Sequence, residues 1–250
     1  MIKFIINADD FGYSRAVNYG IIDAHTEGVL TSTTLMTNMP GAQHAFELAK
    51  SHPSLGIGVH LTLTCGRPLL DSHHTLVDSN GDFKKLHHYQ AKFHVDPDEL
   101  YDEWQAQIEK FLSTGLRPTH LDSHHHVNNL EAMQTMFIKL AREYQLPVRN
   151  NFAGIRDHGL TTTDYFEYQP DVVLLDSERI FEKYKDYDSV EIMCHPAYID
   201  KFLMNSSSYA TPRIEELDAM TSTEVIEKFK ESGQFELITF SGLEGEAVAR

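Results

Sequence analysis

The fold is decided by residues 2–14, which read IKFIINADDFGYS. An apolar run from Phe4 to Ile6 leads into two adjacent carboxylates, Asp9 and Asp10, and then into a glycine turn and Ser14. Like charges at the end of a buried strand are costly, because proximity and burial both raise a carboxyl pKa. Such a pair occurs where a cation binds or where one carboxylate acts as a base. The alternative is a turn in which Asp10 caps the next helix.

Composition sets the class of protein. The chain has 250 residues, of which 41% are hydrophobic, and this suits a single α/β domain spanning residues 1–250. Its 21 basic and 37 acidic residues give a net charge of −16. Binding to nucleic acid or to an anionic membrane requires clustered Lys and Arg, so we expect neither as a partner.

The sequence also predicts a compartment. Cys65 and Cys194 lie far apart and form no disulfide framework, which favours a reducing environment. The N-terminus does not have the pattern of a signal peptide, and the first apolar run is too short to span a membrane. We therefore expect a cytoplasmic protein, with a homodimer as the commonest default for its assembly.

Strand and helix patterns alternate along the chain. Ser14 is a good helix cap, and Asp96-Pro97-Asp98-Glu99 is a strong helix start. Strands are expected over residues 2–8, 30–36, 55–63, 118–122, 146–149, 171–175, 190–194 and 235–240. This alternation implies mostly parallel strands joined by right-handed crossovers. It predicts an α/β fold, a distorted or incomplete TIM-like β/α barrel, with residues 65–94 as a long loop on its active face.

Ionisable side chains gather where the predicted strands end, which is where both barrels and open sheets place their sites. His60 lies near the end of one strand, His124 follows another, and His195 ends a third. Each has a simpler interpretation, since His60 could be a core residue, His124 could be loop surface, and His195 could merely end its strand. Together with the Asp pair, they favour a functional site.

The residue types suit a divalent metal. One carboxylate and two imidazoles leave positions open for water and substrate. The other carboxylate could be the general base for a metal-bound water, and His195 could donate a proton to the leaving group. In an extended backbone, at most two of the three histidines 124–126 could reach one centre. The chemistry implied is hydrolysis of an amide or an ester, and no nucleophile elbow, Walker loop or Rossmann fingerprint suggests another class.

Several motifs occur in an order that resembles the YdjC-type carbohydrate deacetylases, a family that includes chito-oligosaccharide deacetylases. The motifs are NADDFG at 7–12, TSTT at 31–34, GVHL at 58–61, THLDSHHHV at 119–127, CHPA at 194–197, and Pro212-Arg213 followed by Thr221-Ser222. The resemblance implies a divalent ion, with Mg²⁺ expected, and removal of acetyl groups from N-acetylated sugars such as chitobiose. Zn²⁺ would also suit two imidazoles and one carboxylate.

The resemblance also assigns roles to residues. It implies Asp9 as the proton acceptor and Asp10, His60 and His124 as the metal ligands. His195 as the general acid rests on analogy with related metal-dependent deacetylases.

Two further residues, Arg213 and His126, are expected to bind substrate, and Arg213 could instead orient a catalytic carboxylate. Family members often have histidine where this chain has Asn128, which leaves the role of that position open. The alternatives are a hydrolase of another acylated or phosphorylated sugar, and a metal- or sugar-binding protein without turnover.

Overall fold

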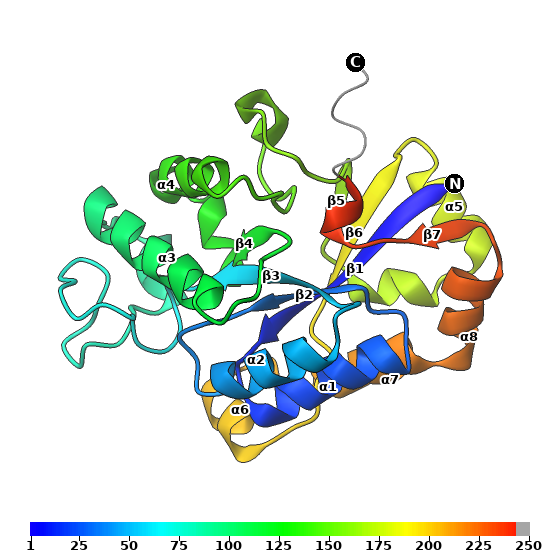
Figure 1. Cartoon of the computed structure of the whole chain (residues 1–250), viewed down its shortest axis with the longest axis horizontal. Helices are drawn as coiled ribbons and strands as arrows, with labels where there is room; N and C mark the ends of the chain where they lie inside the picture. The colour runs from blue at the N-terminus through cyan, green and yellow to red at the C-terminus, as the bar shows by residue number, and fades with distance from the viewer. Residues whose placement is uncertain (244–250) are drawn as a thin grey trace.

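The structure, a computed structural model, describes residues 1–243. A curled sheet of parallel strands forms its centre, with helices packed around the outside (Figure 1). The strand order is β4-β3-β2-β1-β6-β5, and β7 pairs with the first residues of β1. The strands are β1 (Ile2–Phe11), β2 (Ser32–Leu35), β3 (Gly56–Leu61), β4 (Leu121–Ser123), β5 (Tyr165–Glu167), β6 (Ser189–Cys194) and β7 (Phe235–Leu237). The predicted distorted, incomplete barrel is therefore confirmed.

Strand β1 is the central element of this sheet. It pairs with β6 along one edge and with β2 and β7 along the other. Its apolar run is buried, and the ring of Phe4 makes edge contacts with Tyr184, Phe229 and Phe235. A strand covered on both faces is expected to be apolar along its length, so the polar residues at the end of β1 are the exception that needs explaining.

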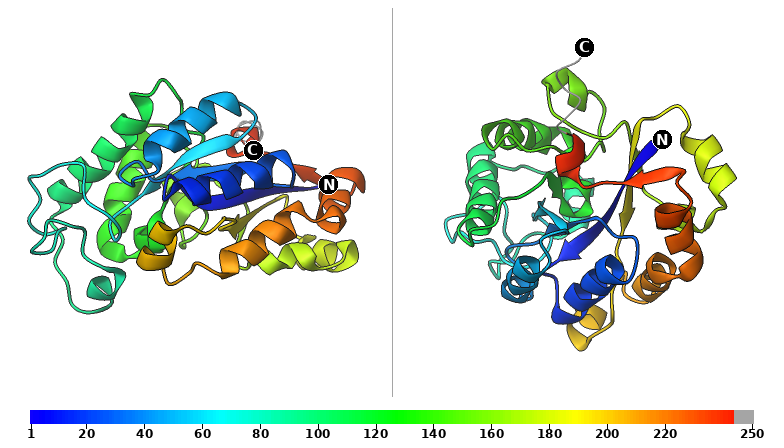
Figure 2. Two further views of the ribbon diagram at one scale, coloured as in Figure 1. Left: turned by 90° about the horizontal axis from the view of Figure 1, so that it is seen from below. Right: turned by 45° about the vertical axis from the view of Figure 1, so that its right-hand side comes forward.

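Helices surround the strands on the outside of the barrel, as the right-hand view of Figure 2 shows. The predicted caps are present, since Ser14 Oγ accepts from the Val17 N–H and the Asp96 side chain accepts from the Asp98 and Glu99 N–H groups. Within residues 1–243, no helix has the length and apolar character that crossing a membrane requires. The helices are α1 (Arg15–Thr26), α2 (Ala42–Ser51), α3 (Pro97–Leu112), α4 (Glu131–Glu143), α5 (Ser177–Tyr184), α6 (Lys201–Ser206), α7 (Pro212–Thr221) and α8 (Thr223–Ile226).

The barrel is irregular between β4 and β5. The strand predicted over residues 146–149 is reduced to a single bridge between Val148 and Leu121. On its other side, the Val148 N–H donates to the Thr161 carbonyl, and the Asn150 amide donates to the Thr163 carbonyl. Isolated backbone and side-chain hydrogen bonds thus replace a regular β-ladder. They still place Arg149 at the end of the barrel where the strands have their carboxyl ends.

One prediction for the middle of the chain is wrong. The strand predicted over residues 171–175 is a 3-10 helix, η4 (Pro170–Leu174), and the fifth strand lies earlier, at Tyr165–Glu167. Pro170 stands just before that stretch and suits the first position of a helical turn, where its missing N–H costs no hydrogen bond. Helices α6 and α7 were not predicted from the sequence.

The segment over residues 65–94 is tied to α3 by two glutamates. The fully buried Glu103 carboxylate accepts from the Leu69 and Leu70 N–H groups. Glu99 accepts from the backbone N–H of His74 and Thr75. These bonds fix the segment against the outer side of the barrel. Of the elements described for residues 1–243, the segment contains one short 3-10 helix, η1 (Leu86–Gln90).

Helix α1 packs closely against the segment that follows β6. A Cβ atom added at Gly20 would lie 2.5 Å from the Ala197 Cα, so the two backbones would have to separate. We expect Gly20→Ala to lower the free energy of unfolding by about 1–3 kcal/mol, measured by urea denaturation. Tyr19→Ala, at an exposed position of the same helix, is the control and should change it by less than about 0.5 kcal/mol. Equal effects of the two substitutions would contradict the close approach.

Candidate active site

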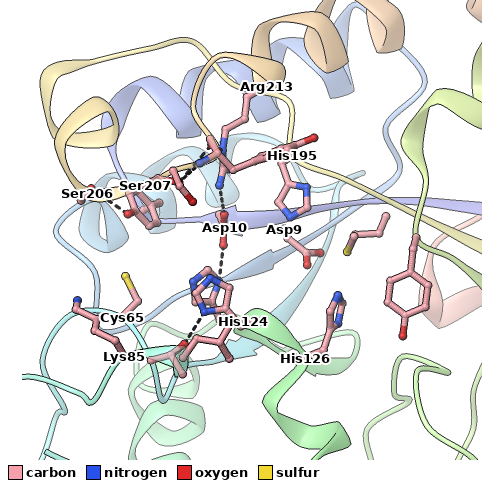
Figure 3. Close-up of a pocket in the computed structure, with 18 of the residues that line it drawn as sticks. Asp9, Asp10, Cys65, Lys85, His124, His126, His195, Ser206, Ser207 and Arg213 are labelled. Atoms are coloured by element: carbon pink, nitrogen blue, oxygen red, sulfur yellow. Dashed lines mark hydrogen bonds and ion pairs between the residues drawn. The ribbon is translucent and has the colours of Figure 1, made fainter. Parts of the chain in front are cut away.

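Both carboxylates of the Asp pair face one cavity of about 620 Å³ at the carboxyl ends of the strands (Figure 3). Regular alternation along a strand would send neighbouring side chains to opposite faces. Here the pairing of β1 with β2 shifts between Ala8 and Phe11, and Asp10 has a left-handed backbone with φ of 75°. Aspartate tolerates this conformation better than most residues. The irregularity therefore turns Asp9 and Asp10 towards the same space.

Asp10 is surrounded by cationic or potentially cationic groups. Its Oδ1 lies 3.0 Å from His124 Nδ1 and 3.5 Å from His60 Nε2. Its Oδ2 accepts a hydrogen bond of 2.6 Å from Arg213 Nη2. Burial raises the pKa of Asp10, but Arg213 and His124 outweigh it and hold that pKa well below its usual range. Asp10 is thus a buried, ionised carboxylate.

His60 is held by a second carboxylate behind it. Its Nδ1 lies 2.7 Å from Asp122 Oδ1, which directs Nε2 towards Asp9 and Asp10. Burial lowers the pKa of His60, but the carboxylates of Asp122 and Asp9 raise it to about 10. A carboxylate on the far nitrogen is the usual way to orient a histidine that binds a metal.

The side chains around Asp10 could hold a divalent cation. Asp10, His60 and His124 each offer a ligand atom, and these atoms lie within 4.8 Å of one another. Among the described residues, the buried Asp10 Oδ1 and His60 Nε2 have no hydrogen-bond partner, although His124 Nδ1 lies 3.0 Å from Asp10 Oδ1. Buried polar atoms left unpaired at one point suit an ion that would coordinate both.

A second possible ligand group, formed by Asp9, His60 and Asp122, has the same spacing. Its carboxylates are already occupied by the buried guanidinium of Arg149, which lies 2.6 Å from Asp9 Oδ1 and 2.9 Å from Asp122 Oδ2. This cation competes with any metal for these oxygens. The group containing Asp10 is therefore the better candidate.

Arg149, which the sequence did not single out, lies beside the Asp pair and pairs with three buried carboxylates. Its guanidinium is fully buried and also donates to Glu191 Oε1 at 2.8 Å. Burial raises the pKa of Asp9, but Arg149 outweighs it and holds that pKa well below its usual range. Burial raises the pKa of Glu191 to about 7. The available signal was that Arg149 and Glu191 are charged residues within predicted buried strands.

His195 follows β6 and lies beside Asp9 in the cavity, as Figure 3 shows. Its backbone N–H donates to the Glu216 carboxylate, and its ring centroid lies 5.5 Å from that of Tyr209. Burial lowers the pKa of His195, so its imidazole is neutral at neutral pH. A proton donated by His195 must therefore be taken up during the reaction.

All three histidines 124–126 line the cavity. They lie in a 3-10 helix, η2 (His124–Asn129), in which His125 and His126 have left-handed φ angles of 56° and 52°. Of the three, His124 reaches Asp10, whereas His125 Nδ1 contacts Thr64 Oγ1 at 2.8 Å.

Asn128 is buried and supports His126 indirectly. Its amide donates to Asn151 Oδ1 at 2.8 Å, and the Asn151 amide lies 3.2 Å from His126 Nδ1. Asn128 Oδ1 also accepts from the Ser123 hydroxyl. The position thus belongs to a polar network behind His126 and not to the cavity wall.

Other polar residues near the strand ends divide between the cavity and the core. Arg213 is buried, lines the cavity and contacts Asp10, and one of its terminal nitrogens, Nη1, has no hydrogen-bond partner. Lys85 and His87 bring the segment over residues 65–94 to the cavity wall. His120, which also stands near a strand end, is instead a core residue whose ring stacks on Phe240.

Removing Arg149 should be strongly destabilising, because three carboxylates would lose their shared cation. We expect Arg149→Met to lower the free energy of unfolding by about 3–5 kcal/mol in urea denaturation at neutral pH. Arg156→Met is the matched control, since Arg156 pairs with Asp164 at the surface and should contribute less than about 1 kcal/mol. Equal free energies of unfolding for the two variants would contradict a stabilising role for the buried network around Arg149.

Solved structures share this fold. A crystal structure from Enterococcus faecalis, of a candidate cellobiose-phosphate cleavage protein, matches with a TM-score of 0.85 and 40% identity, covering 97% of this chain and 98% of that one. A lactam utilization protein from Thermus thermophilus matches with a TM-score of 0.52 and 14% identity, covering 94% of this chain and 99% of that one. The second likeness concerns the fold alone.

Related sequences align with nearly the full length of this chain. A carbohydrate deacetylase from Brevibacillus brevis is 43% identical over 250 residues, covering 97% of this chain and 100% of that protein. One from Clostridium beijerinckii is 40% identical over 252 residues, with the same coverage. The family described as YdjC-like protein matches residues 3–231. The expected family is thereby confirmed, and the chain belongs to the YdjC-like family.

Proposed function

We propose that the protein is a metal-dependent hydrolase that removes acetyl groups from N-acetylated sugars such as chitobiose or other small chito-oligosaccharides. The observation that carries the proposal is the division of the Asp pair. Asp10 lies next to His60 and His124, and its Oδ1 has no hydrogen-bond partner. Asp9 lines the same cavity and is paired with Arg149. The relatives named carbohydrate deacetylases support the substrate class.

Asp10, His60 and His124 would hold the divalent ion. When bound, such an ion lowers the pKa of a water molecule and polarises the carbonyl of the acetyl group. The resemblance to the deacetylases favours Mg²⁺, while two imidazoles in the ligand set would also suit Zn²⁺.

Asp9 is proposed to accept the proton of the attacking water. Its carboxylate lies within 3.9 Å of His60 Nε2, so it stands next to the ligand atoms. Because its pKa is held low, it is ionised throughout the neutral range, although the same low pKa makes it a weak base. Arg149 acts through Asp9 as a positioning residue, since its two contacts fix the orientation of the carboxylate.

His195 is proposed to deliver a proton to the nitrogen of the departing amino sugar. It would first take up a proton released within the cavity, because its imidazole starts neutral. Arg213 would orient the Asp10 carboxylate, with which it makes a hydrogen bond of 2.6 Å, and its unpaired nitrogen would remain available for substrate. His126, on the opposite wall, would contact the sugar.

A phosphorylated sugar is the second candidate for substrate. Lys85 and His87 line the same cavity and would suit an anionic group. The Enterococcus relative, described in connection with a sugar phosphate, points in the same direction. A metal- or sugar-binding protein without turnover is less well supported, since neither Asp9 nor His195 would then have a chemical role.

Asp9→Asn tests the proposed mechanism. Acetate release from N-acetylated chitobiose with added Mg²⁺ should fall by at least about 100-fold, because the proton acceptor is lost. Metal binding, measured by calorimetry, should persist in this variant. His60→Gln should lose both metal binding and activity. Unchanged acetate release by Asp9→Asn would remove Asp9 from the mechanism.

Metal binding should release protons. The carboxylates around His60 and His124 raise their pKa values to about 10 and about 9, although burial opposes this, so both are protonated at pH 7 before a metal binds. A bound ion requires neutral imidazoles, so its affinity should rise with pH up to about 10, the higher of the two pKa values. Calorimetry at one pH in buffers with different ionisation enthalpies measures the protons released. A binding enthalpy independent of the buffer would contradict this assignment of ligands.

A further inference from the structure

One buried carboxylate near the Asp pair has no role in the mechanism proposed above. Glu191, on β6, is fully buried and does not line the cavity. Its Oε1 accepts a hydrogen bond from Arg149 Nε and lies 2.8 Å from Arg149 Nη2. Among the described residues, its Oε2 is buried and has no hydrogen-bond partner. Glu191 therefore meets the site through Arg149.

Keeping a carboxylate at this position lowers the stability of the fold. A buried acceptor without a partner costs about 1–3 kcal/mol, because it has lost its hydrogen bonds to water. The residues on either side, Val190 and Ile192, are apolar and fully buried, as is usual for a strand inside a parallel sheet. Residues that depart from such a pattern at a cost are concentrated at functional sites. What Glu191 contributes follows from its contact with Arg149.

The guanidinium of Arg149 is divided between three carboxylates. Its Nη1 donates to Asp9 Oδ2 at 2.8 Å and lies 2.9 Å from Asp122 Oδ2. Its Nη2 donates to Asp9 Oδ1 at 2.6 Å, and its Nε donates to Glu191 Oε1 at 2.8 Å. A guanidinium is planar and rigid, so an acceptor that fixes Nε also fixes the directions of both Nη groups. Glu191 thereby sets the angle at which Arg149 meets Asp9.

The two oxygens of Asp9 are held unequally. Oδ1 accepts from Arg149 Nη2 and, at 3.0 Å, from Asn7 Nδ2. Oδ2 accepts from Arg149 Nη1 and lies 3.9 Å from His60 Nε2. Oδ2 thus has one hydrogen bond fewer and lies nearer to a proposed ligand atom. Because Asn7 holds only Oδ1, the position of Oδ2 depends on the orientation of the guanidinium.

We propose that Glu191 is a positioning residue that acts through Arg149. It holds the guanidinium at the angle that keeps Oδ1 of Asp9 tied and directs Oδ2 towards His60. It also takes up hydrogen bonds of Arg149 that would otherwise go to Asp9. The proposal rests on the proposed function, in which Asp9 accepts a proton, and adds a residue that touches neither the substrate nor the reacting atoms.

Substitutions of Glu191 test this role in acetate release from chitobiose. Glu191→Met removes both oxygens at nearly the same side-chain length, and kcat should fall about tenfold or more because Asp9 is displaced. KM should change by less than about twofold, since no substrate contact is lost. Glu191→Gln keeps an oxygen that can accept from Arg149 Nε, so it should retain kcat within about threefold of the unsubstituted protein.

A matched control and a second substitution guard against general damage. Glu167 is also a buried glutamate, on the neighbouring strand β5, but it pairs with Lys183. Glu167→Met should change kcat by less than about twofold. Glu191→Asp keeps the charge but shortens its reach to Arg149, and it should lower kcat by about threefold or more even if Glu191→Met does not fold.

A double variant separates positioning from an independent effect. If Glu191 acts through Asp9, Glu191→Met should cause no further loss of kcat in the Asp9→Asn protein. Losses that multiply would overturn the proposal, and so would an unchanged kcat in both Glu191→Met and Glu191→Asp.

Crystal structures of the variants measure the position without turnover. The distance of 3.9 Å from Asp9 Oδ2 to His60 Nε2 should change by more than about 0.5 Å in Glu191→Met and stay within that margin in Glu191→Gln. Asp9 unmoved in Glu191→Met would overturn the positioning role. Absence of acetate from every sugar tested would overturn the proposed function, while the crystallographic comparison would still decide whether Glu191 positions Asp9.

Discussion

The site depends on the cost of burying two adjacent carboxylates at the end of β1. Each is compensated separately, since Arg149 lies within hydrogen-bond distance of both oxygens of Asp9, and Arg213 with two histidines surrounds Asp10. Two acidic residues that are neighbours in sequence therefore have different electrostatic surroundings. One faces potential metal ligands and the other is held as an ionised group, so one strand end can provide two chemical functions.

The backbone makes this division possible. Asp10 and His126 both adopt left-handed φ angles, of 75° and 52°. Such conformations cost of order 1–3 kcal/mol for residues other than glycine and persist where the surrounding structure fixes them. Here they bring consecutive side chains into one cavity, which regular strands cannot do. Among residues 1–243, His125 shares this conformation at the cavity, and Gln145, which follows α4 and does not line the cavity, also adopts it.

Much of the fold could be predicted from local signals. The apolar run of β1 and the helix cap at Asp96 were sufficient for their elements, because burial on both faces and capping are encoded within a few residues. The fifth strand and α7 could not be predicted in this way. β5 has only three residues, and Tyr165–Glu167 forms a strand because it pairs with β6, a contact distant in sequence.

The sequence by itself determined the family and the barrel class, because strand patterns and motifs are read along the chain. The candidate ligands Asp10, His60 and His124 came from the resemblance of those motifs to the family. Only the tertiary structure decided that Arg149 holds Asp9 and that all three histidines 124–126 face one cavity. Arg149 lies 140 positions from Asp9 along the chain, so no pattern in either segment reveals their contact. A buried ion pair is specified by where the chain folds back on itself, and its geometry is set by burial and packing across the barrel.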